Sequence, residues 1–594
     1  MGKIRTIRWL ALLLLLFLGV GILGYWAYPR VVAAHYDIII YGGGFAGCAS
    51  ARSAASLAPD KKVLLIVPDP VPALGGLGTI GGQNFADIRY WQERLVTRGS
   101  FAFWFDQSGQ FYNTGEMAEI LRRDLARFPN LEILYQHDLK GVLTWKKAVR
   151  VLSLAPIKRD GDGTVAWQKG WRAVWGKVFI DASDEGRLVR LAGNQVTVGR
   201  QDWPAEHLEA FNEGRPASKA QDPAGSVPSS WARQQAATLM FKVKGVKTPV
   251  QPGQYGDFYF ALDFKGSWGL VGGQGIWQND GTVRNFNESF RAKGFAIKPI
   301  NAAQNGAGSA EWWVNMLLVF DVDGRASEKD RGSSRFPVLG EGQKTVDQAW
   351  QEARALLERP EFLQALRRFT VAVDGEEYGF GEADLVRDQE NKPVVGQVMY
   401  LRETVHGLCR GEAGGVFVDD GAAGKAEKYF ALTTEEAQKA GAGSGFGAEQ
   451  KIVWGADRDN FTDRIGLGNY MMDINAYRPE DLQHKGQYVW PVTGYLRPDW
   501  QAAGGQPVNP VYLPYAMLLP SDSVNLLVPG YATSCTSLAW SEIRVLPNLT
   551  VLGDAAGTAA ARAVLFGENP ADFGPAQWQW MQEQLRKNGA CLDK

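Results

Sequence analysis

The sequence contains little cysteine and little histidine. Its 594 residues include five histidines and four cysteines, which are Cys48, Cys409, Cys535 and Cys591. No two cysteines form a C-x-x-C pair, so an iron–sulfur cluster or a zinc ribbon cannot be assembled from them, and four are too few for a disulfide framework. Any redox chemistry therefore needs an organic cofactor.

An excess of either charge is also missing. The chain has 63 lysines and arginines against 64 aspartates and glutamates. This balance excludes binding by bulk charge, and we expect no nucleic-acid partner. A chain of 594 residues is too long for one compact core, so we expect two or more lobes.

One long hydrophobic run stands near the start. Residues 9–28 (WLALLLLLFLGVGILGYWAY) carry no charge and have the length that an α-helix needs to cross a bilayer. Lys3, Arg5 and Arg8 precede the run and Arg30 follows it, which places the N-terminus in the cytoplasm and the body across the membrane. The sequence predicts a single-pass anchor whose partner is the lipid bilayer. The alternative is a signal peptide cleaved near the small residues 32–34, which leaves a secreted protein.

A glycine motif follows this run. Residues 36–41 (YDIIIY) and 62–67 (KVLLIV) read as short buried strands with an alanine-rich helical stretch between them. The segment after the first strand, GGGFAG, matches G-x-G-x-x-G. Such glycines permit a tight turn and a close approach to a pyrophosphate, which the N–H groups of the following helix then bind. We expect a dinucleotide to contact Gly42, Gly44, Phe45, Ala46 and Gly47.

The acidic residue expected at the end of the second strand is absent. In dinucleotide-binding folds this residue accepts hydrogen bonds from the ribose, but here the position holds Val67, followed by Pro68 and Asp69. Either Asp69 reaches the ribose from two residues further on, or backbone groups alone hold it.

The rest of the chain mixes strand-like and helical patterns. Hydrophobic periodicity predicts helices at residues 116–128, 186–192 and 345–369, and strands at 131–135, 177–180, 238–243, 313–322, 525–528 and 549–552. Residues 212–230 are rich in proline, glycine and serine and indicate a loop or boundary, and residues 411–447 read as a surface excursion. This order suggests a nucleotide-binding domain interrupted by an α+β insert.

Two further glycine segments point to a family. Residues 74–82 (LGGLGTIGG) follow the second strand, and residues 552–560 (LGDAAGTAA) lie near the other end. With the first motif they resemble the bacterial FAD-dependent oxidoreductase family, distantly related to the fumarate reductase and succinate dehydrogenase flavoproteins. The resemblance implies that FAD is the cofactor and that the isoalloxazine is lined by Gly75, Gly76 and Thr79. It also implies a closing segment, with Asp554 on the ribityl chain, made of Gly553, Asp554, Ala555, Ala556 and Gly557.

The resemblance covers most of residues 36–565. It includes residues 179–186 (FIDASDEG), 401–404 (LRET), 470–474 (YMMDI) and 525–530 (NLLVPG). The chain departs from the family at Val67, at Ser183-Asp184, where the family has Thr-Gly, and at Val405-His406, where it usually has two arginines. These departures put adenosine recognition and a substrate anion site in doubt.

The resemblance implies an α/β protein with a discontinuous Rossmann-like FAD-binding domain and an inserted α+β substrate domain. The hydrophobic run at residues 9–28 places one N-terminal transmembrane helix before these domains. We expect the anchor or signal at residues 1–35, the FAD-binding domain at 36–210 and 516–570, the substrate domain at 211–515, and a C-terminal helix at 571–594.

A helix N-terminus is expected beside the flavin. An oxidised flavin that accepts hydride gathers negative charge near N1 and C2=O, so a helix that begins at residues 555–558 would stabilise the reduced form. None of the five histidines lies in or beside the glycine motifs, so we expect FAD to be noncovalent.

Charged residues outside the glycine motifs are candidates for the substrate side. Hydride transfer to flavin commonly needs a base for the substrate proton and a cation for a carboxylate or developing oxyanion. Arg402 and His406 would fill these catalytic roles if their segment faces the flavin, and Arg544 is a third candidate. The alternative is that each forms a surface salt bridge or, for His406, packs as a satisfied core histidine.

Together these observations predict an FAD-dependent oxidoreductase. It would take hydride from an unidentified small organic substrate and pass electrons to an external acceptor, a membrane quinone or oxygen, because the chain has no cluster or haem motif of its own. Two alternatives stay open: a noncatalytic flavin-binding scaffold anchored in the membrane, and a lyase that uses flavin without net redox change.

Overall fold

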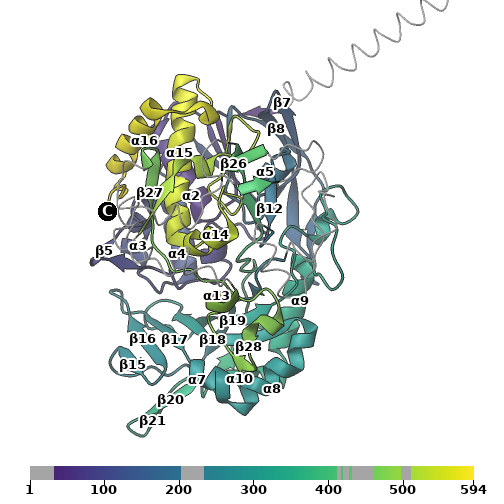
Figure 1. The fold of residues 1–594 in the computed structure, drawn as a ribbon, viewed down its shortest axis with the longest axis vertical. Coiled ribbons are helices and arrows are strands. Elements are labelled where there is room, and N and C mark those ends of the chain that lie inside the picture. The colour runs from purple at the N-terminus through teal and green to yellow at the C-terminus, as the bar shows by residue number, and fades with distance from the viewer. Residues whose placement is uncertain (1–32, 202–232, 411–415, 419–426, 431–460, 497–509) are drawn as a thin grey trace, which may run out of the picture.

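The computed structural model describes residues 33–201, 233–410, 416–418, 427–430, 461–496 and 510–594. The predicted transmembrane segment 9–28, the predicted boundary 212–230 and most of the predicted excursion 411–447 lie outside the described residues. The described part is a mixed α/β structure with parallel and antiparallel sheets, arranged as an upper and a lower half in Figure 1.

A five-stranded parallel sheet forms the centre of the upper half. Its order is β31 (Leu526–Leu527), β11 (Val178–Asp181), β2 (Ile38–Tyr41), β3 (Val63–Val67) and β6 (Leu131–Tyr135). Every residue of β2, β3 and β11 is buried, which explains why these strands read as continuous apolar runs. The strands predicted at residues 36–41, 62–67, 131–135 and 177–180 are confirmed, and β31 covers part of 525–528.

Helices α2 (Phe45–Leu57) and α15 (Leu546–Phe566) pack against each other on one face of this sheet (Figure 1). The strand predicted at residues 549–552 is wrong, because these residues lie inside α15. Four apolar residues do not distinguish a buried strand from a buried helix, and Pro547 in the first turn is the missed signal of a helix start. Among the described helices α15 alone is long and apolar enough to span a membrane, but 89% of its most hydrophobic window is buried in the body.

A second, mainly antiparallel sheet lies beside the parallel one. It contains β1 (Ala34–His35), β10 (Arg172–Trp175), β8 (Ala148–Arg159), β7 (His137–Trp145) and β9 (Val165–Trp167). Strand β1 pairs in parallel with β10, and the chain then turns into β2. The first described residues therefore lie at the end of β2 opposite to the glycine motif that follows Tyr41.

An eight-stranded sheet forms the lower half (Figure 1). Its members are β15 (Gly253–Tyr255), β16 (Phe258–Leu262), β17 (Trp268–Gly272), β18 (Phe295–Gln304), β19 (Trp312–Val319), β14 (Phe241–Lys244), β22 (Asp384–Leu385) and β13 (Ala237–Thr238). Helix α8 (Gly281–Phe290) packs on β18. The single helix predicted at 345–369 is two helices, α9 (Val346–Leu357) and α10 (Pro360–Leu366), because Pro360 cannot continue the first and begins the second.

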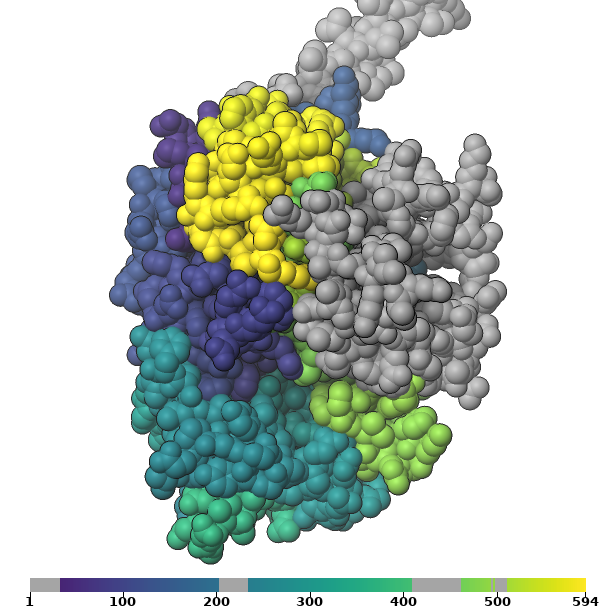
Figure 2. Space-filling model, turned by 60° about the vertical axis from the view of Figure 1, so that its left-hand side comes forward, coloured from purple at the N-terminus to yellow at the C-terminus, as the bar shows by residue number. Residues whose placement is uncertain are grey.

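The chain leaves the upper half and returns to it. Strand β31 pairs with β11, and Asn525 Nδ2 donates 2.7 Å to the carbonyl of Lys177, so the C-terminal part completes a sheet begun by the N-terminal part. Figure 2 shows the yellow C-terminal residues against the purple and blue N-terminal ones, with the teal insert below. The described topology is that of a discontinuous α/β domain with an insert, while the predicted domain limits remain predictions.

Candidate functional site

The first glycine motif lies in the turn between β2 and α2. Gly42 has φ +118°, and an added Cβ would lie 2.5 Å from the carbonyl carbon of Ala182. An added Cβ at Gly47 would lie 1.8 Å from the carbonyl oxygen of Gly42. A Cβ on Gly44, in contrast, would meet nothing within 4 Å. Packing therefore requires glycine at positions 42 and 47, whereas position 44 borders open space.

The second glycine segment lies directly against the first. The Gly75 N–H donates 2.8 Å to the carbonyl of Gly43, and Gly75 adopts φ +98°. Thr79 Oγ1 donates 2.5 Å to the carbonyl of Leu74 and closes the turn. The structure thus brings together the two glycine segments that the sequence singled out, and both Gly44 and Gly76 line the same cavity.

This cavity has a volume of about 990 Å³, including space open to solvent. Its wall includes the Gly42–Gly44 turn, the segment after β3, the segment after β11, and residues 397–399 with Leu401. Helix α2 begins here without a side-chain cap, so the N–H groups of its first turn have no acceptor within the helix and are available to an anion. The open space at Gly44 and the uncapped N–H groups at the start of α2 fit the phosphates of a dinucleotide cofactor.

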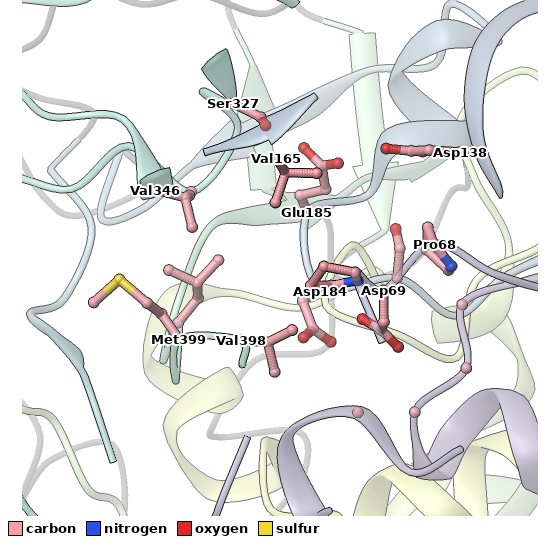
Figure 3. A pocket seen from close by; sticks show the side chains of 18 of the residues that line it. Pro68, Asp69, Asp138, Val165, Asp184, Glu185, Ser327, Val346, Val398 and Met399 are labelled. Carbon is pink, nitrogen blue, oxygen red and sulfur yellow. The ribbon is translucent and has the colours of Figure 1, made fainter. Parts of the chain in front are cut away.

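Two carboxyl groups stand next to each other on the cavity wall. Figure 3 shows Asp69 and Asp184 side by side, with Val346 and Met399 across the cavity. Burial raises the pKa of Asp69 to about 7, and Asp184 adds to this rise. Burial also raises the pKa of Asp184 to about 7, with a further contribution from Glu185. Both side chains nevertheless keep intermediate exposure, as expected for groups that face an enclosed space rather than the outer surface.

The structure explains two departures from the family pattern. Val67 is fully buried, and an added Cβ at Gly43 would lie 2.6 Å from its Cγ1, so this position packs against the glycine turn while Asp69 reaches the cavity. Ser183 Oγ donates 2.6 Å to Asp181, and this bond holds the turn that presents Asp184. Asp69 remains the predicted ribose ligand.

A buried ion network supports the acidic wall and was not predicted from the sequence. Arg187, at the start of α5 (Arg187–Leu191), lies 2.6 Å from Asp330 and 3.4 Å from Asp138, and its side chain is 1% exposed. Tyr41 donates to Asp138 at 2.5 Å. Asp138 itself lines the cavity. These partners come from separate segments, so no local pattern could reveal them.

The residues of the predicted closing segment do not line this cavity. Residues 553–557 are in the middle of α15, so the prediction that a helix begins at residues 555–558 is wrong. Added Cβ atoms at Gly553 and Gly557 would lie 2.2 Å and 2.3 Å from the carbonyl oxygens of Ala46 and Ser50 in α2. These glycines, with the fully buried Ala555 and Ala556, allow α15 to approach α2 closely.

The Asp554 carboxylate joins α15 to α2 by hydrogen bonds and does not line the cavity. Asp554 accepts hydrogen bonds from Ser53 Oγ at 2.7 Å, from Ser100 Oγ at 2.6 Å and from Ser100 N–H at 2.8 Å. It is 1% exposed and is not among the residues that line the cavity. The helix that does begin in this region starts at Leu546, next to Arg544.

His406 is paired inside the protein. It lies in β23 (Val405–Gly407), is fully buried, and its Nε2 is 2.8 Å from Glu403 Oε1. Ser537 Oγ also donates to Glu403 Oε1, at 2.5 Å. His406 does not line the cavity. The geometry is that of a satisfied core histidine, the alternative weighed for it above.

The other two predicted catalytic residues belong to one charged cluster, which we define as Asp87, Lys298, Tyr400, Arg402, Asp473 and Arg544. Arg544 Nη2 lies 2.6 Å from Asp473, and Arg544 also bonds the Tyr400 hydroxyl. Burial lowers the pKa of Arg544, but Tyr400 and Asp473 more than offset this and leave it above its usual value. Arg544 is therefore held as a fixed cation.

Arg402 is a buried cation of a different kind. Its guanidinium donates to the carbonyl of Ala236, to Thr238 Oγ1 and to Asn315 Oδ1, at 2.9, 2.7 and 3.1 Å, and it lies 4.5 Å from the centre of the Tyr400 ring. Within the described residues no carboxylate pairs with it. Burial lowers its pKa below the usual value, although its charge is retained.

The cluster adjoins the cavity. Met399 and Leu401 line the cavity, and Tyr400 lies between them in the chain. Asn315, which accepts from Arg402, donates 3.0 Å to Gln83 at the end of the second glycine segment. Tyr531 connects the cavity wall with the cluster. Its N–H donates to the Ser183 carbonyl on the cavity wall, and both Asp184 of the wall and Arg544 of the cluster influence the pKa of its hydroxyl. Asp87 and Lys298 complete the cluster and were not predicted from the sequence.

Comparison with known proteins gives the family. The model of the family described as FAD dependent oxidoreductase matches residues 37–412 and 446–585. No curated protein matches the chain. Solved structures that match include the FrdA chain of E. coli quinol fumarate reductase, with 12% identity, 94% of this chain and 74% of that chain covered, and a TM-score of 0.28. They also include CabE, an aromatic hydroxylase from angucycline biosynthesis (13% identity, 67% and 57%, TM-score 0.27), and the myxobacterial chondrochloren halogenase CndH (13%, 48% and 53%, TM-score 0.24).

These individual likenesses are too distant to indicate a substrate. The family match, in contrast, covers most of the chain, including both glycine segments and the charged cluster. The chain belongs to the FAD-dependent oxidoreductase family and is an enzyme with FAD as its cofactor.

Proposed function

We propose that the enzyme removes hydride from a small organic substrate bound at the charged cluster, and that electrons then pass to an external acceptor, a quinone or dioxygen. The observation that carries this proposal is a buried cluster with three basic side chains beside the cavity that fits FAD. Buried cations without matching carboxylates are costly, and their retention is typical of sites that bind an anionic or electron-rich oxygen.

The cavity residues would hold the cofactor. The first turn of α2 would bind the pyrophosphate, Gly44 and Gly76 would leave room for it, and Asp69 would accept hydrogen bonds from the ribose. Bound FAD supplies hydride acceptance, which no side chain of the chain provides.

The cluster residues would orient the substrate. Arg544 is fixed by Asp473 and Tyr400, so its guanidinium would present the same face to a substrate oxygen in every turnover. Arg402, held by three neutral acceptors, keeps an uncompensated charge that would bind a carboxylate or stabilise a developing oxyanion. Neither role needs His406.

Anaerobic mixing tests this function. The body from His35 onward, loaded with FAD, would be mixed with a panel of alcohols, 2-hydroxy acids and primary amines while flavin absorbance is recorded. We expect one class to bleach the flavin, and re-oxidation by a soluble quinone or by dioxygen then identifies the acceptor. Product formation without any bleaching would contradict hydride transfer and would indicate a lyase.

We also propose that the full chain is held at a membrane by residues 9–28, with the body on the extracytoplasmic side. The hydrophobic run and the flanking basic residues support this, and only seven residues separate Tyr28 from Tyr36, a reach of about 25 Å. Membrane flotation of the full chain tests it, and recovery of a soluble protein that begins after residue 34 would show cleavage and secretion instead.

A further inference from the structure

Lys298 occupies an irregular point in the largest sheet. Residues 295–297 of β18 pair with 319–317 of β19, residues 301–304 pair with 315–312, and the register shifts between Ile297 and Asn301. Lys298 lies in this shift and is 7% exposed. A bulge of this kind re-aims a side chain, and bulges are frequent next to active sites. The fold therefore turns a lysine into the interior of the molecule.

Among the described residues, the Lys298 ammonium group has no acceptor. No hydrogen bond and no ion pair within 4.0 Å involves it there, and Nζ lies 5.4 Å from the centre of the Trp490 ring. The other two basic residues of the cluster, Arg402 and Arg544, both donate hydrogen bonds to oxygen acceptors. A buried ammonium without an acceptor is costly, so this environment favours the neutral amine.

The charged groups around Lys298 come from four different segments. They are Arg402, Asp473, Asp87 and Arg544, and burial together with Arg402 lowers the pKa of Lys298 to about 7. Asp473 is already paired with Arg544. Asp87 is therefore the carboxylate left to exchange a proton with Lys298.

Asp87 lies in a left-handed turn beside the second glycine segment. Its φ is +49°, a conformation that aspartate adopts more readily than most residues other than glycine. Gln83 Nε2 donates to its carboxylate at 3.3 Å. Burial raises its pKa to about 6, against the opposing effect of Arg544, although the side chain keeps intermediate exposure.

We propose that Lys298 is the base that takes the substrate proton and that Asp87 passes this proton on. The inference rests on the proposed function. Asp87 accepts from Gln83, Gln83 is bonded to Asn315 of β19, and β19 pairs with β18 at Asn301, three residues after Lys298. No ion pair within 4.0 Å joins the two groups in the described structure, so the proton would pass between them through a substrate group or a water molecule. Two groups that hold protons with similar strength exchange them at little cost near neutral pH.

In an H–C–O–H or H–C–N–H substrate, the carbon loses hydride, which carries two electrons to the cofactor. The O–H or N–H bond breaks, its electron pair forms the second bond to carbon, and the proton bonds to the lone pair of the Lys298 amine. The resulting ammonium then gives its proton to the Asp87 carboxylate or to water, which restores the amine.

Lys298→Met tests the proposal by its pH profile. With the panel compound that bleaches the wild-type flavin fastest, we expect the wild-type rate to rise about tenfold per pH unit up to pH 7 and then level off, since the amine must be neutral. The variant should bleach the flavin at least 100-fold more slowly, without this dependence, and added ethylamine should restore part of the rate in Lys298→Ala. Lys242→Met is the matched control, because Lys242 also lies in this sheet over a tryptophan ring but is paired with Glu311 at 2.7 Å.

A measurement without substrate distinguishes failure of the proposed function from failure of the role proposed for Lys298. NMR of reductively ¹³C-methylated lysines should show a resonance that titrates near pH 7 and is absent from Lys298→Arg, while ordinary lysines titrate near pH 10. Burial also lowers the pKa of Lys594 to about 7, so Lys594→Arg identifies the second resonance expected in this range. If no panel compound bleaches the wild type, the proposed function fails, and the lysine titration alone decides the state of Lys298. An unchanged pH profile in Lys298→Met, or the absence of any resonance near pH 7 that Lys298→Arg removes, overturns the role of Lys298.

Discussion

The cofactor cavity and the charged cluster are adjacent but are built in opposite ways. The cavity is formed by backbone: Gly42 and Gly47 permit a close turn, and Gly44 leaves space beside it. The cluster is formed by long charged side chains such as Arg402 and Arg544, which meet from distant segments. A site built from backbone leaves a compact glycine motif in the sequence, whereas a site built from side chains leaves scattered residues without a pattern.

The largest effect is expected at Gly553, where the backbones of α15 and α2 are in close contact. Gly553→Leu would place a side chain where an added Cβ already lies 2.2 Å from the Ala46 carbonyl oxygen, so α15 must move away from α2. We expect a loss of about 3 kcal/mol or more in the free energy of unfolding, measured by chemical denaturation, and loss of FAD with it. Gly281→Ala is the control, since a Cβ there meets nothing within 4 Å and alanine favours a helix. Wild-type stability of Gly553→Leu would contradict close packing at this point.

A smaller but more selective effect is expected in the cluster. Arg544→Met should lower kcat/KM about 100-fold to 1,000-fold while FAD affinity changes little, because the guanidinium acts on the substrate side. Anaerobic bleaching rates and FAD titration measure the two quantities separately. Arg354→Met is the control, because Arg354 pairs with Asp388 at 2.8 Å outside the cluster. A large fall in FAD affinity, with an unchanged bleaching rate for the FAD that remains bound, would contradict a substrate-side role for Arg544.

Substitution of Asp554 tests whether this residue belongs to the packing of α15 or to the FAD site. Asp554→Ala removes the acceptor of Ser53 and Ser100, so we expect the free energy of unfolding to fall by about 1–3 kcal/mol. FAD affinity of the folded protein should stay within about threefold of wild type, since Asp554 does not line the cavity. A stable variant with much weaker FAD binding would instead restore the family role as a ribityl ligand.

The smallest effect is a pH dependence of cofactor binding. Asp184 has a pKa of about 7 and is not proposed to contact the ribose, and it is largely neutral at pH 6 and ionised at pH 8. Ionised carboxylates repel a pyrophosphate, and we expect FAD affinity to rise as the pH falls from 8 to 6, by about three- to tenfold. Asp184→Asn should bind FAD more tightly than wild type at pH 8 and should show a weaker pH dependence in titration calorimetry.

The same pKa shifts affect stability. A carboxyl whose pKa is raised on folding contributes stability at low pH that is lost as the pH rises through the folded-state value, here about 7 for Asp184. The FAD-free protein should therefore unfold more easily at pH 8 than at pH 6, and Asp184→Asn should reduce this difference. An equal pH dependence in the variant would assign the effect to other groups.

The sequence was sufficient for the backbone-built region. Continuous apolar runs predicted β2, β3, β6 and β11, and the glycine turn between β2 and α2 was located to the residue. The failure at residues 549–560 has a physical cause: the interior of a tightly packed glycine- and alanine-rich helix reads like a strand followed by a helix start. Pro547 was the local signal that would have corrected it.

The sequence was insufficient for the cluster. Arg402 and Arg544 were singled out by their segments, but His406 is paired with Glu403, which no pattern in the segment reveals. Lys298 depends on a register shift between β18 and β19, which is set by the pairing of strands rather than by local sequence. Asp87 joins the cluster through Gln83 and Asn315, and Asn315 is more than 200 residues away in the chain. Such residues can be identified only from the three-dimensional structure.

The most direct test of the account is FAD binding by Gly44→Val. Position 44 has an extended backbone that any residue adopts, and a Cβ there meets no protein atom within 4 Å, so the variant should fold with the stability of the wild type. The added side chain would occupy the space beside the first turn of α2, where the pyrophosphate is expected. We predict a folded, colourless protein that releases no FAD on denaturation. A yellow variant with wild-type FAD affinity would show that this cavity does not hold the cofactor.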